Sequence, residues 1–262
     1  MSPPTPLLDF FKRGEVARDV KLLAAAGALA PRAIEQLSIL VLLLDDADPE
    51  IRSSAQQTID RIPIEALAGV LGSSDVPIGV REFFADRGVF PAEIPAIIVD
   101  EPLIDTEAAE EETTDDERPL DEEERSSIVQ KLQKMGFTDR LKAAVKGSRE
   151  VRNILIRDPN KMIAASVLSS PKLSEQEVES YSRMTHVSED VLRIIGGNRA
   201  WTKNYGVVFS LCRNPKAPIA LSLNLLNRLN DRDVNTLSTD RNIPEPLRTA
   251  ARRKVVMGQQ KR

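Results

Sequence analysis

Proline, glycine and aspartate divide the first part of this chain into short helical segments, and this punctuation restricts the fold to an array of small helices. Apolar residues recur with helical spacing over 15–26, and this stretch ends at Gly27. Pro31 opens a second segment, whose apolar run LSILVLLL (37–44) indicates a buried helix. That run is far shorter than the roughly 20 residues that a membrane-spanning helix needs. Three more helices are expected to open at prolines: Pro49, Pro63 and Pro77.

The composition agrees with small packed helices. Aromatic residues make up only 4% of the 262 residues, so the core must consist of Leu, Ile, Val and Ala, which suit closely packed helices better than a β-sandwich. The single cysteine, Cys212, cannot form an internal disulfide, which favours a reducing compartment. The N-terminal sequence MSPPTPLLDFFKRGE lacks the features of a secretory signal. We therefore predict an all-α protein of the cytoplasm that has no membrane among its partners.

Charge is divided into three blocks that the formal net charge of −4 conceals. Residues 1–99 carry a net charge of −5, residues 100–125 carry −12, and residues 126–262 carry +13. The middle block is highly charged and almost free of apolar residues, so it is expected to be disordered. The predicted organisation is an N-terminal helical array over 1–95, an acidic disordered linker over 96–125 and a basic helical domain over 126–262.

Two interpretations of the acidic linker are open. It can be a solubilising tether, kept extended by its like charges. Alternatively, it can lie on the basic C-terminal half as an intramolecular competitor and screen that half from other ligands. The apolar, proline-broken stretch 89–99 just before it is expected to be an extended piece packed on a helical surface.

The C-terminal half contains an internal repeat with a spacing of 44 residues. Asn160, Ser166, Pro171 and Lys172 recur as Asn204, Ser210, Pro215 and Lys216. Each predicted unit consists of a helix that ends at S-S-P or R-N-P, a second helix and a shorter third one. Helical repeats with periods of about 40 to 47 residues are typical of HEAT and armadillo-type α-solenoids, in which each unit buries its apolar face only by stacking on the next.

The turns S-S-P-K (169–172) and R-N-P-K-A-P (213–218), each followed by an apolar helix, carry a resemblance to a protein family. They resemble turns of HEAT-like and leucine-rich-repeat-variant α-solenoids of bacterial proteins. The similarity covers 150–257, with a looser echo in DPEIRSSA (48–55). It implies a short HEAT-like α-solenoid that serves as a scaffold or binding surface, and it implies no particular chemistry. The number of repeats is too small for a long superhelix.

The residues that most enzyme active sites need are scarce. With one histidine (His186) and one cysteine, the chain has too few His and Cys ligands for the usual zinc sites. His186 lies in a turn just before Ser188, a predicted N-cap, and is expected to be solvated. Neither a phosphate-binding G-x-x-x-x-G-K-[ST] loop nor a G-x-G-x-x-G motif is present. We therefore predict no catalytic residues, no cofactor and no enzymatic activity, and an enzyme that uses carboxylates alone is the third hypothesis.

The segment RIIGGNRAWTKNY (193–205) is the candidate binding site. It places three basic residues around the only tryptophan, with a tyrosine one turn later on the expected helical face: Arg193, Arg199, Trp201, Lys203 and Tyr205. Such a combination suits an acidic protein segment anchored by Trp, or phosphates and stacked bases. The alternative is that the two aromatic residues belong to the core and that the basic residues form its solvated rim.

Two hypotheses for function follow. The first is a non-catalytic interaction or scaffold protein that binds another protein, possibly an acidic one, through the C-terminal solenoid. The second is a nucleic-acid-binding module in which the acidic linker competes with the nucleic acid. Binding of a protein would depend strongly on Trp201 and Arg199 at any salt concentration. Binding of nucleic acid would depend weakly on every basic residue of one face and would fall steeply with salt.

Overall fold

The computed structural model describes residues 6–93, 101–104 and 122–260. Over these residues it contains sixteen α-helices, one short 3-10 helix and no β-strand. The prediction of an all-α fold is therefore confirmed. The chain divides into two compact units, the first made of Met1–Ile154 and Ser166–Lys172, the second of Leu155–Ala165 and Leu173–Arg262.

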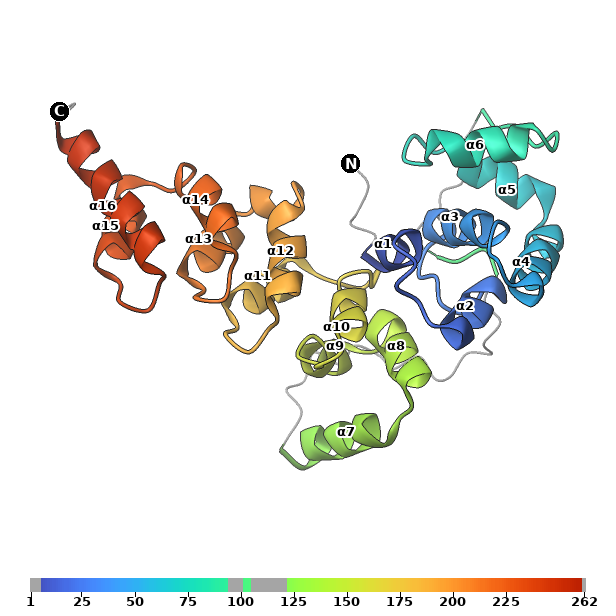
Figure 1. Cartoon of the computed structure of the whole chain (residues 1–262), viewed down its shortest axis with the longest axis horizontal. Helices are drawn as coiled ribbons and strands as arrows, with labels where there is room; N and C mark the ends of the chain where they lie inside the picture. The colour runs from blue at the N-terminus through green and yellow to red at the C-terminus, as the bar shows by residue number, and fades with distance from the viewer. Residues whose placement is uncertain (1–5, 94–100, 105–121, 261–262) are drawn as a thin grey trace. The chain divides into compact units, whose positions relative to one another are not determined.

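The first unit begins with a cluster of short helices (Figure 1). These are α1 (Pro6–Lys12), α2 (Arg18–Ala25), α3 (Ala33–Leu43), α4 (Pro49–Arg61), α5 (Ile64–Leu71) and α6 (Ile78–Ala85). Helix α3, which carries the apolar run 37–44, packs against α1, α2, α4 and α6, and Leu37 and Leu40 have no exposed surface. The buried helix expected there is confirmed. A helix buried on nearly all sides needs apolar residues around its whole circumference, which explains an uninterrupted run.

The helix boundaries follow local chemistry. Pro49 is the first residue of α4, and the Asp48 carboxylate accepts the Glu50 N–H at 2.9 Å as an N-cap. Helix α2 ends at Ala25 and is followed by the cap residue Ala26 and by Gly27, whose φ of +89° is a left-handed conformation that glycine adopts without strain. The Gly27 N–H bonds to the Ala24 carbonyl (3.0 Å) and the next N–H, of Ala28, to the Leu23 carbonyl (3.1 Å), which is a Schellman motif.

Part of the predicted disordered linker is held against α3. The buried side chain of Gln36 donates from Nε2 to the carbonyls of Gly27 (3.0 Å) and Ile104 (2.7 Å). Its Oε1 accepts the N–H groups of Leu103 (2.8 Å) and Ile104 (3.1 Å). One amide therefore joins the end of α2 to residues 103–104. Residues 96–100 and 105–121 of the predicted linker lie outside the described residues.

The C-terminal boundary of the predicted linker also differs from the start of helical structure. Helix α7 (Glu122–Lys134) begins four residues before the predicted start of the C-terminal domain, and α8 (Phe137–Lys146) and α9 (Arg149–Leu155) follow it. The first unit includes the chain up to Ile154, so the predicted domains 1–95 and 126–262 do not coincide with the two units. Composition marks where the charge changes sign, whereas a compact unit is defined by packing, and the two need not agree.

Two further details complete the first unit. The stretch 89–93, which was expected to be extended, is not helical, and its Ala92 N–H bonds to the Ala68 carbonyl of α5 at 2.9 Å. The rest of that stretch, up to Val99, is not described. Arg152 of α9 is 1% exposed and donates to the carbonyls of Gly147 (2.9 Å) and Lys172 (3.3 Å), which ties residue 172 to α9 within the same unit.

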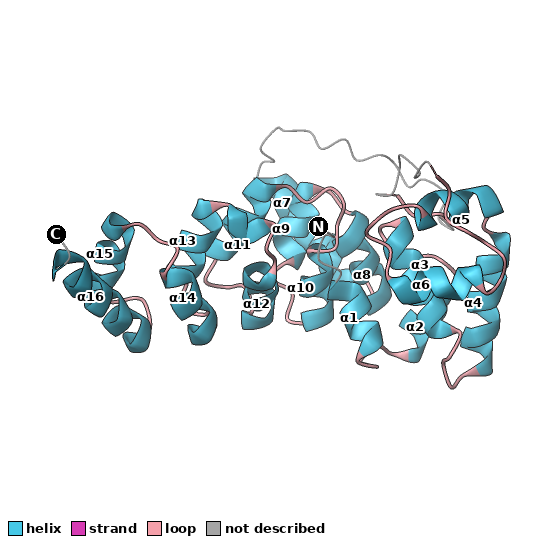
Figure 2. Cartoon of the chain, turned by 90° about the horizontal axis from the view of Figure 1, so that it is seen from above, coloured by secondary structure: helices cyan, strands magenta, loops and turns pink. Residues whose placement is uncertain are grey.

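The second unit contains residues 155–165, which include most of helix α10 (Lys161–Val167), and then three helical hairpins. Its elements are α11 (Glu175–Arg183), α12 (Glu189–Gly197), the 3-10 helix η1 (Trp201–Lys203), α13 (Tyr205–Arg213), α14 (Ile219–Leu226), α15 (Asp231–Thr239) and α16 (Glu245–Gln260). Figure 2 shows α11, α13 and α15 in one layer, with α12, α14 and α16 in the other. Helix α13 packs against both α11 and α15, and α14 packs against α16.

The packing repeat is therefore two helices, not the three helices of the 44-residue period. The loops inside the three hairpins each have five residues, 184–188, 214–218 and 240–244. The fourth residue of each loop is buried: Val187, Ala217 and Ile243. Thirty residues separate the first two of these positions and 26 the last two.

The 44-residue correspondence has a local cause. Asn160 and Asn204 both cap a following helix, with Oδ1 accepting the N–H two residues on at 2.9 and 2.8 Å. The two asparagines correspond because both begin a helix with a similar capping turn, not because their helices occupy equivalent positions in the stack of hairpins. A motif that is dictated by a helix start can recur at any helix start.

Candidate protein-interaction surface

The candidate segment is broken by the loop between α12 and α13, residues 198–204, which we name the α12–α13 loop. Helix α12 ends at Gly197, η1 covers Trp201–Lys203, and Asn204 has φ −69° and ψ 119°, which is not helical. Asn204 caps α13, whose first residue is Tyr205. Trp201 and Tyr205 therefore do not share a helical face, and that part of the prediction is wrong.

Tyr205 joins two neighbouring hairpins. Its hydroxyl donates to the Asp233 carboxylate of α15 and accepts the Asn230 N–H at 3.2 Å. Desolvation and the hydrogen bond to Asp233 raise the pKa of the tyrosine above its usual value. The residue remains 42% exposed. Tyr205 thus forms a structural hydrogen bond and is also accessible to solvent.

Trp201 is half-buried within a firmly held loop. The adjacent Thr202 is buried, and its hydroxyl donates to the Asn198 carbonyl at 2.9 Å. The Asn198 Oδ1 accepts the Ala200 N–H at 2.9 Å, and Arg228 from the next hairpin donates to the Thr202 carbonyl. These bonds fix the loop on both sides of the tryptophan.

The three basic residues of the candidate site differ in their surroundings. Arg193 pairs with Glu189 (2.5 Å) and Asp190 (2.9 Å) on its own helix, so its charge is already compensated. Asp190 also pairs with Lys161 at 2.8 Å. This bond is the main cause of a lowered pKa of Asp190, and the nearby Arg193 lowers the pKa further. Arg199 and Lys203 are exposed, and neither side chain has a hydrogen bond or an ion pair with any residue in the part of the chain that the structure describes.

Several other basic residues of the second unit are used internally. They donate to main-chain carbonyls at helix ends, where backbone acceptors lack a helical donor. These pairs are Arg228 with Thr202, Arg252 with Ser238 (2.9 Å) and Lys254 with Leu226 (2.8 Å). The positive charge of the C-terminal half therefore overstates how many cations are free to bind a ligand.

Cys212 and His186 lie where the sequence analysis expected them. Cys212 has no exposed surface, its Sγ lies 3.7 Å from the Ser222 carbonyl, and burial raises the pKa of its thiol to about 12. His186 is exposed in the loop between α11 and α12, where Ser188 caps α12. Among the described residues, no group of three or more His, Cys, Asp or Glu side chains is arranged to hold a metal ion.

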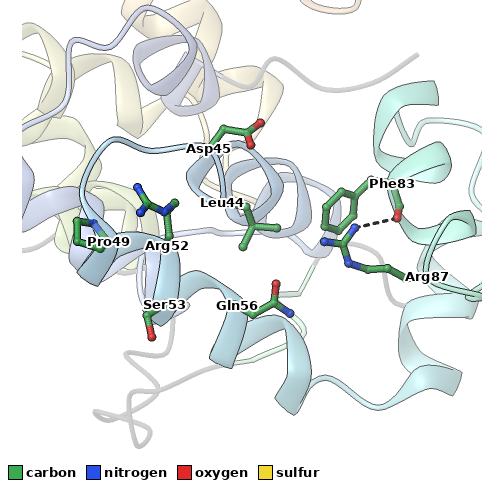
Figure 3. A pocket seen from close by; sticks show the side chains of 8 residues that line it. All are labelled: Leu44, Asp45, Pro49, Arg52, Ser53, Gln56, Phe83 and Arg87. Carbon is green, nitrogen blue, oxygen red and sulfur yellow. Dashed lines mark hydrogen bonds between the residues drawn. The ribbon is translucent and has the colours of Figure 1, made fainter.

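A second surface, which the sequence analysis did not find, lies in the first unit (Figure 3). It is an open hollow of about 480 Å³ between the end of α3, helix α4 and the end of α6. Its lining residues are Leu44, Asp45, Pro49, Arg52, Ser53, Gln56, Phe83 and Arg87. These come from three separate stretches of sequence and share no motif, so no sequence signal could have brought them together.

No family model, no curated protein and no solved structure matches this chain. None of the helices in the described residues is both long and apolar enough to cross a lipid bilayer.

Proposed function

We propose that this chain is a cytoplasmic, non-catalytic interaction protein whose second unit is a short α-solenoid that binds an acidic protein. The observation that carries the proposal is the α12–α13 loop, where the uncompensated cations Arg199 and Lys203 flank the half-buried Trp201. The stacking of α11 with α13 and α15, and of α14 with α16, supports the solenoid part of the proposal.

The loop suits binding because it is already ordered. Hydrogen bonds of Asn198, Thr202 and Arg228 hold its backbone, so little conformational entropy is lost when a ligand contacts it. A partly buried tryptophan beside free basic side chains has the composition of an interaction hot spot. Carboxylates of a partner protein would find donors at Arg199 and Lys203 that no acidic residue of 6–93, 101–104 or 122–260 occupies.

The distribution of cations favours a protein over a nucleic acid. Binding along a phosphate backbone needs many cations free on one face. Here Arg193 is paired with carboxylates, and Arg252 and Lys254 are bonded to carbonyls. Two free cations beside one aromatic side chain form a local anchor. Nucleic-acid binding, with the acidic segment as its competitor, remains the alternative that the following experiment addresses.

We expect the full-length protein to bind a fluorescein-labelled oligo-glutamate peptide, and the double variant Arg199→Ala/Lys203→Ala to bind it about tenfold or more weakly. Hydrogen bonds to charged groups contribute about 1.5 to 3 kcal/mol each, and about 1.4 kcal/mol corresponds to tenfold in affinity. Fluorescence polarisation at about 50 and 200 mM salt measures the affinity of the wild type and of the variant for this peptide. The same measurement is made with labelled single- and double-stranded DNA. Trp201→Ala should also weaken peptide binding at both salt concentrations.

The matched control is Lys216→Ala/Arg241→Ala, which removes two exposed cations from the loops inside the hairpins. This control should change peptide affinity by less than about twofold, in line with the small effects of scattered surface charges. If DNA binds more tightly than the peptide, loses affinity steeply with salt and is weakened equally by both double variants, the nucleic-acid alternative replaces the proposal.

A further inference from the structure

The hollow of the first unit contains two arginines that are held in place without a carboxylate. Arg52 of α4 donates from one nitrogen, Nη1, to the carbonyls of Asp46 (2.6 Å) and Ala47 (3.0 Å). The nearby acids are engaged elsewhere, because Asp46 pairs with Lys21 (2.7 Å) and Asp48 with Arg18 (2.7 Å). The remaining donors of Arg52 are therefore open to a ligand.

Arg87 is fixed in a different way. Its guanidinium lies over the ring of Phe83, 3.5 Å from the ring centroid, and its Nη1 donates to the Phe83 carbonyl at 3.3 Å. Stacking on an aromatic face holds the plane of the guanidinium and leaves its outer N–H groups for hydrogen bonds. Neither Arg52 nor Arg87 pairs with a carboxylate in the parts of the chain that the structure describes.

The space between the two arginines is lined by both polar and apolar side chains. In Figure 3 the side chain of Leu44 lies between Arg52 and Arg87, with Gln56 to one side. Asp45 also lines the hollow and opposes any anion near it. The volume of about 480 Å³ falls within the range of about 300 to 1,000 Å³ that is usual for ligand sites.

We propose that this hollow binds an extended acidic peptide segment in which one apolar side chain stands between two carboxylates. The apolar side chain rests on Leu44, one carboxylate accepts from Arg52, and the other accepts from Arg87. A free oxyanion such as phosphate would meet one arginine and leave the apolar surface uncovered. Because the guanidiniums are held before binding, the ligand does not have to order them. This site is separate from the α12–α13 loop and does not depend on the function proposed for that loop.

The test uses the whole chain and a fluorescein-labelled peptide with the core Glu-Gly-Leu-Gly-Glu between glycine–serine flanks, read by fluorescence polarisation at about 50 mM salt. In an extended peptide, side chains two and four residues apart lie on one face, so the leucine and both carboxylates can face the hollow together. Arg52→Gln and Arg87→Gln should each weaken binding about tenfold, as expected for the loss of a charge-assisted hydrogen bond. Arg87→Lys keeps the charge but loses the stacked planar fork, and it should weaken binding several-fold. Replacing the leucine of the peptide with serine should also reduce affinity.

Arg61→Gln is the matched control, because Arg61 is exposed on α4 and does not line the hollow. It should leave affinity unchanged. Every variant is measured in the Arg199→Ala/Lys203→Ala background, so that the cations of the α12–α13 loop do not contribute to peptide binding. Thermal melts establish that each variant is folded, and Arg87→Gln keeps the test valid if Arg52→Gln unfolds.

Three results would overturn the proposal. One is no saturable binding of the Glu-Gly-Leu-Gly-Glu peptide. A second is equal loss of affinity in Arg61→Gln. The third is complete displacement of the peptide by inorganic phosphate at a concentration equal to that of the peptide, because the hollow would then accept any oxyanion.

Discussion

Replacing Glu35 with glutamine should stabilise the protein at pH 8 by about 3 kcal/mol and remove most of the pH dependence of its unfolding between about pH 4.5 and 7. Glu35 lies near the start of α3 with 1% of its surface exposed. Burial raises the pKa of this carboxyl from 4.5 to about 7, and the nearby Asp9 adds to the rise. The Arg32 guanidinium and the Leu8 N–H oppose it, yet neither carboxylate oxygen accepts a well-formed hydrogen bond.

The direction of the pH effect follows from proton binding. The folded state holds a proton on Glu35 up to about pH 7, whereas the unfolded chain releases it near pH 4.5. Between these values the folded state binds more protons, so the free energy of unfolding falls as pH rises. The contribution is fully present below pH 4.5 and is lost above pH 7. Glutamine is neutral throughout and stays close to the protonated form in shape.

Urea unfolding followed by circular dichroism at several pH values between 4.5 and 8 measures the effect. Glu65→Gln is the control, since it removes the same charge from an exposed position on α5. We expect the control to keep the pH dependence of the wild-type protein. If Glu35→Gln shows the same dependence on pH as the wild type, the buried carboxyl is not the group that causes it.

Replacing Asn214 with alanine should destabilise the second unit by about 3 kcal/mol, because it breaks several buried hydrogen bonds at once. Asn214 is 3% exposed in the loop between α13 and α14. Its Nδ2 donates to the carbonyls of Ser182 (2.9 Å) and Met184 (3.0 Å) in the preceding hairpin. Its Oδ1 accepts the Lys216 N–H at 3.0 Å. The variant leaves carbonyls without donors where water has little access.

The comparison is with Asn224→Ala, an exposed asparagine on α14. Thermal and urea unfolding of both variants should show a large loss of stability for Asn214→Ala and a change within about 0.5 kcal/mol for the control. Equal stabilities would mean that solvent replaces the bonds of Asn214 without cost. In that case the contact between hairpins would be held by its apolar residues alone.

The sequence allowed the helices to be predicted well, because their signals are local. The apolar run of α3, the cap at Asp48 and the stop at Gly27 each depend on residues within one or two turns. The repeat was misread for the same reason, since N-cap asparagines mark helix starts and carry no information about which helix stacks on which.

The candidate site was predicted in part. Arg199, Trp201 and Lys203 are together in one loop, as their closeness in sequence requires. The break at Asn204 was missed, because asparagine inside a helical pattern and asparagine at a cap look alike in one sequence. The compensation of Arg193 by Glu189 could have been read from their spacing of four residues. The hollow could not have been predicted, because Leu44, Arg52 and Arg87 meet only through tertiary packing.

The two-helix packing of the second unit also determines which of its helices unfold first. Among the described residues, the α13–α14 hairpin packs against a hairpin on each side, whereas α15–α16 packs against a hairpin on one side. In such a nearest-neighbour stack, the end hairpin can detach without breaking the contacts of the others. Amide protons of α16 should therefore exchange with solvent before those of α13. Opening of α15–α16 would break the bond of Tyr205 to Asp233, next to the α12–α13 loop. The bonds of Asn198 and Thr202 within that loop would persist, so Trp201 would stay in place.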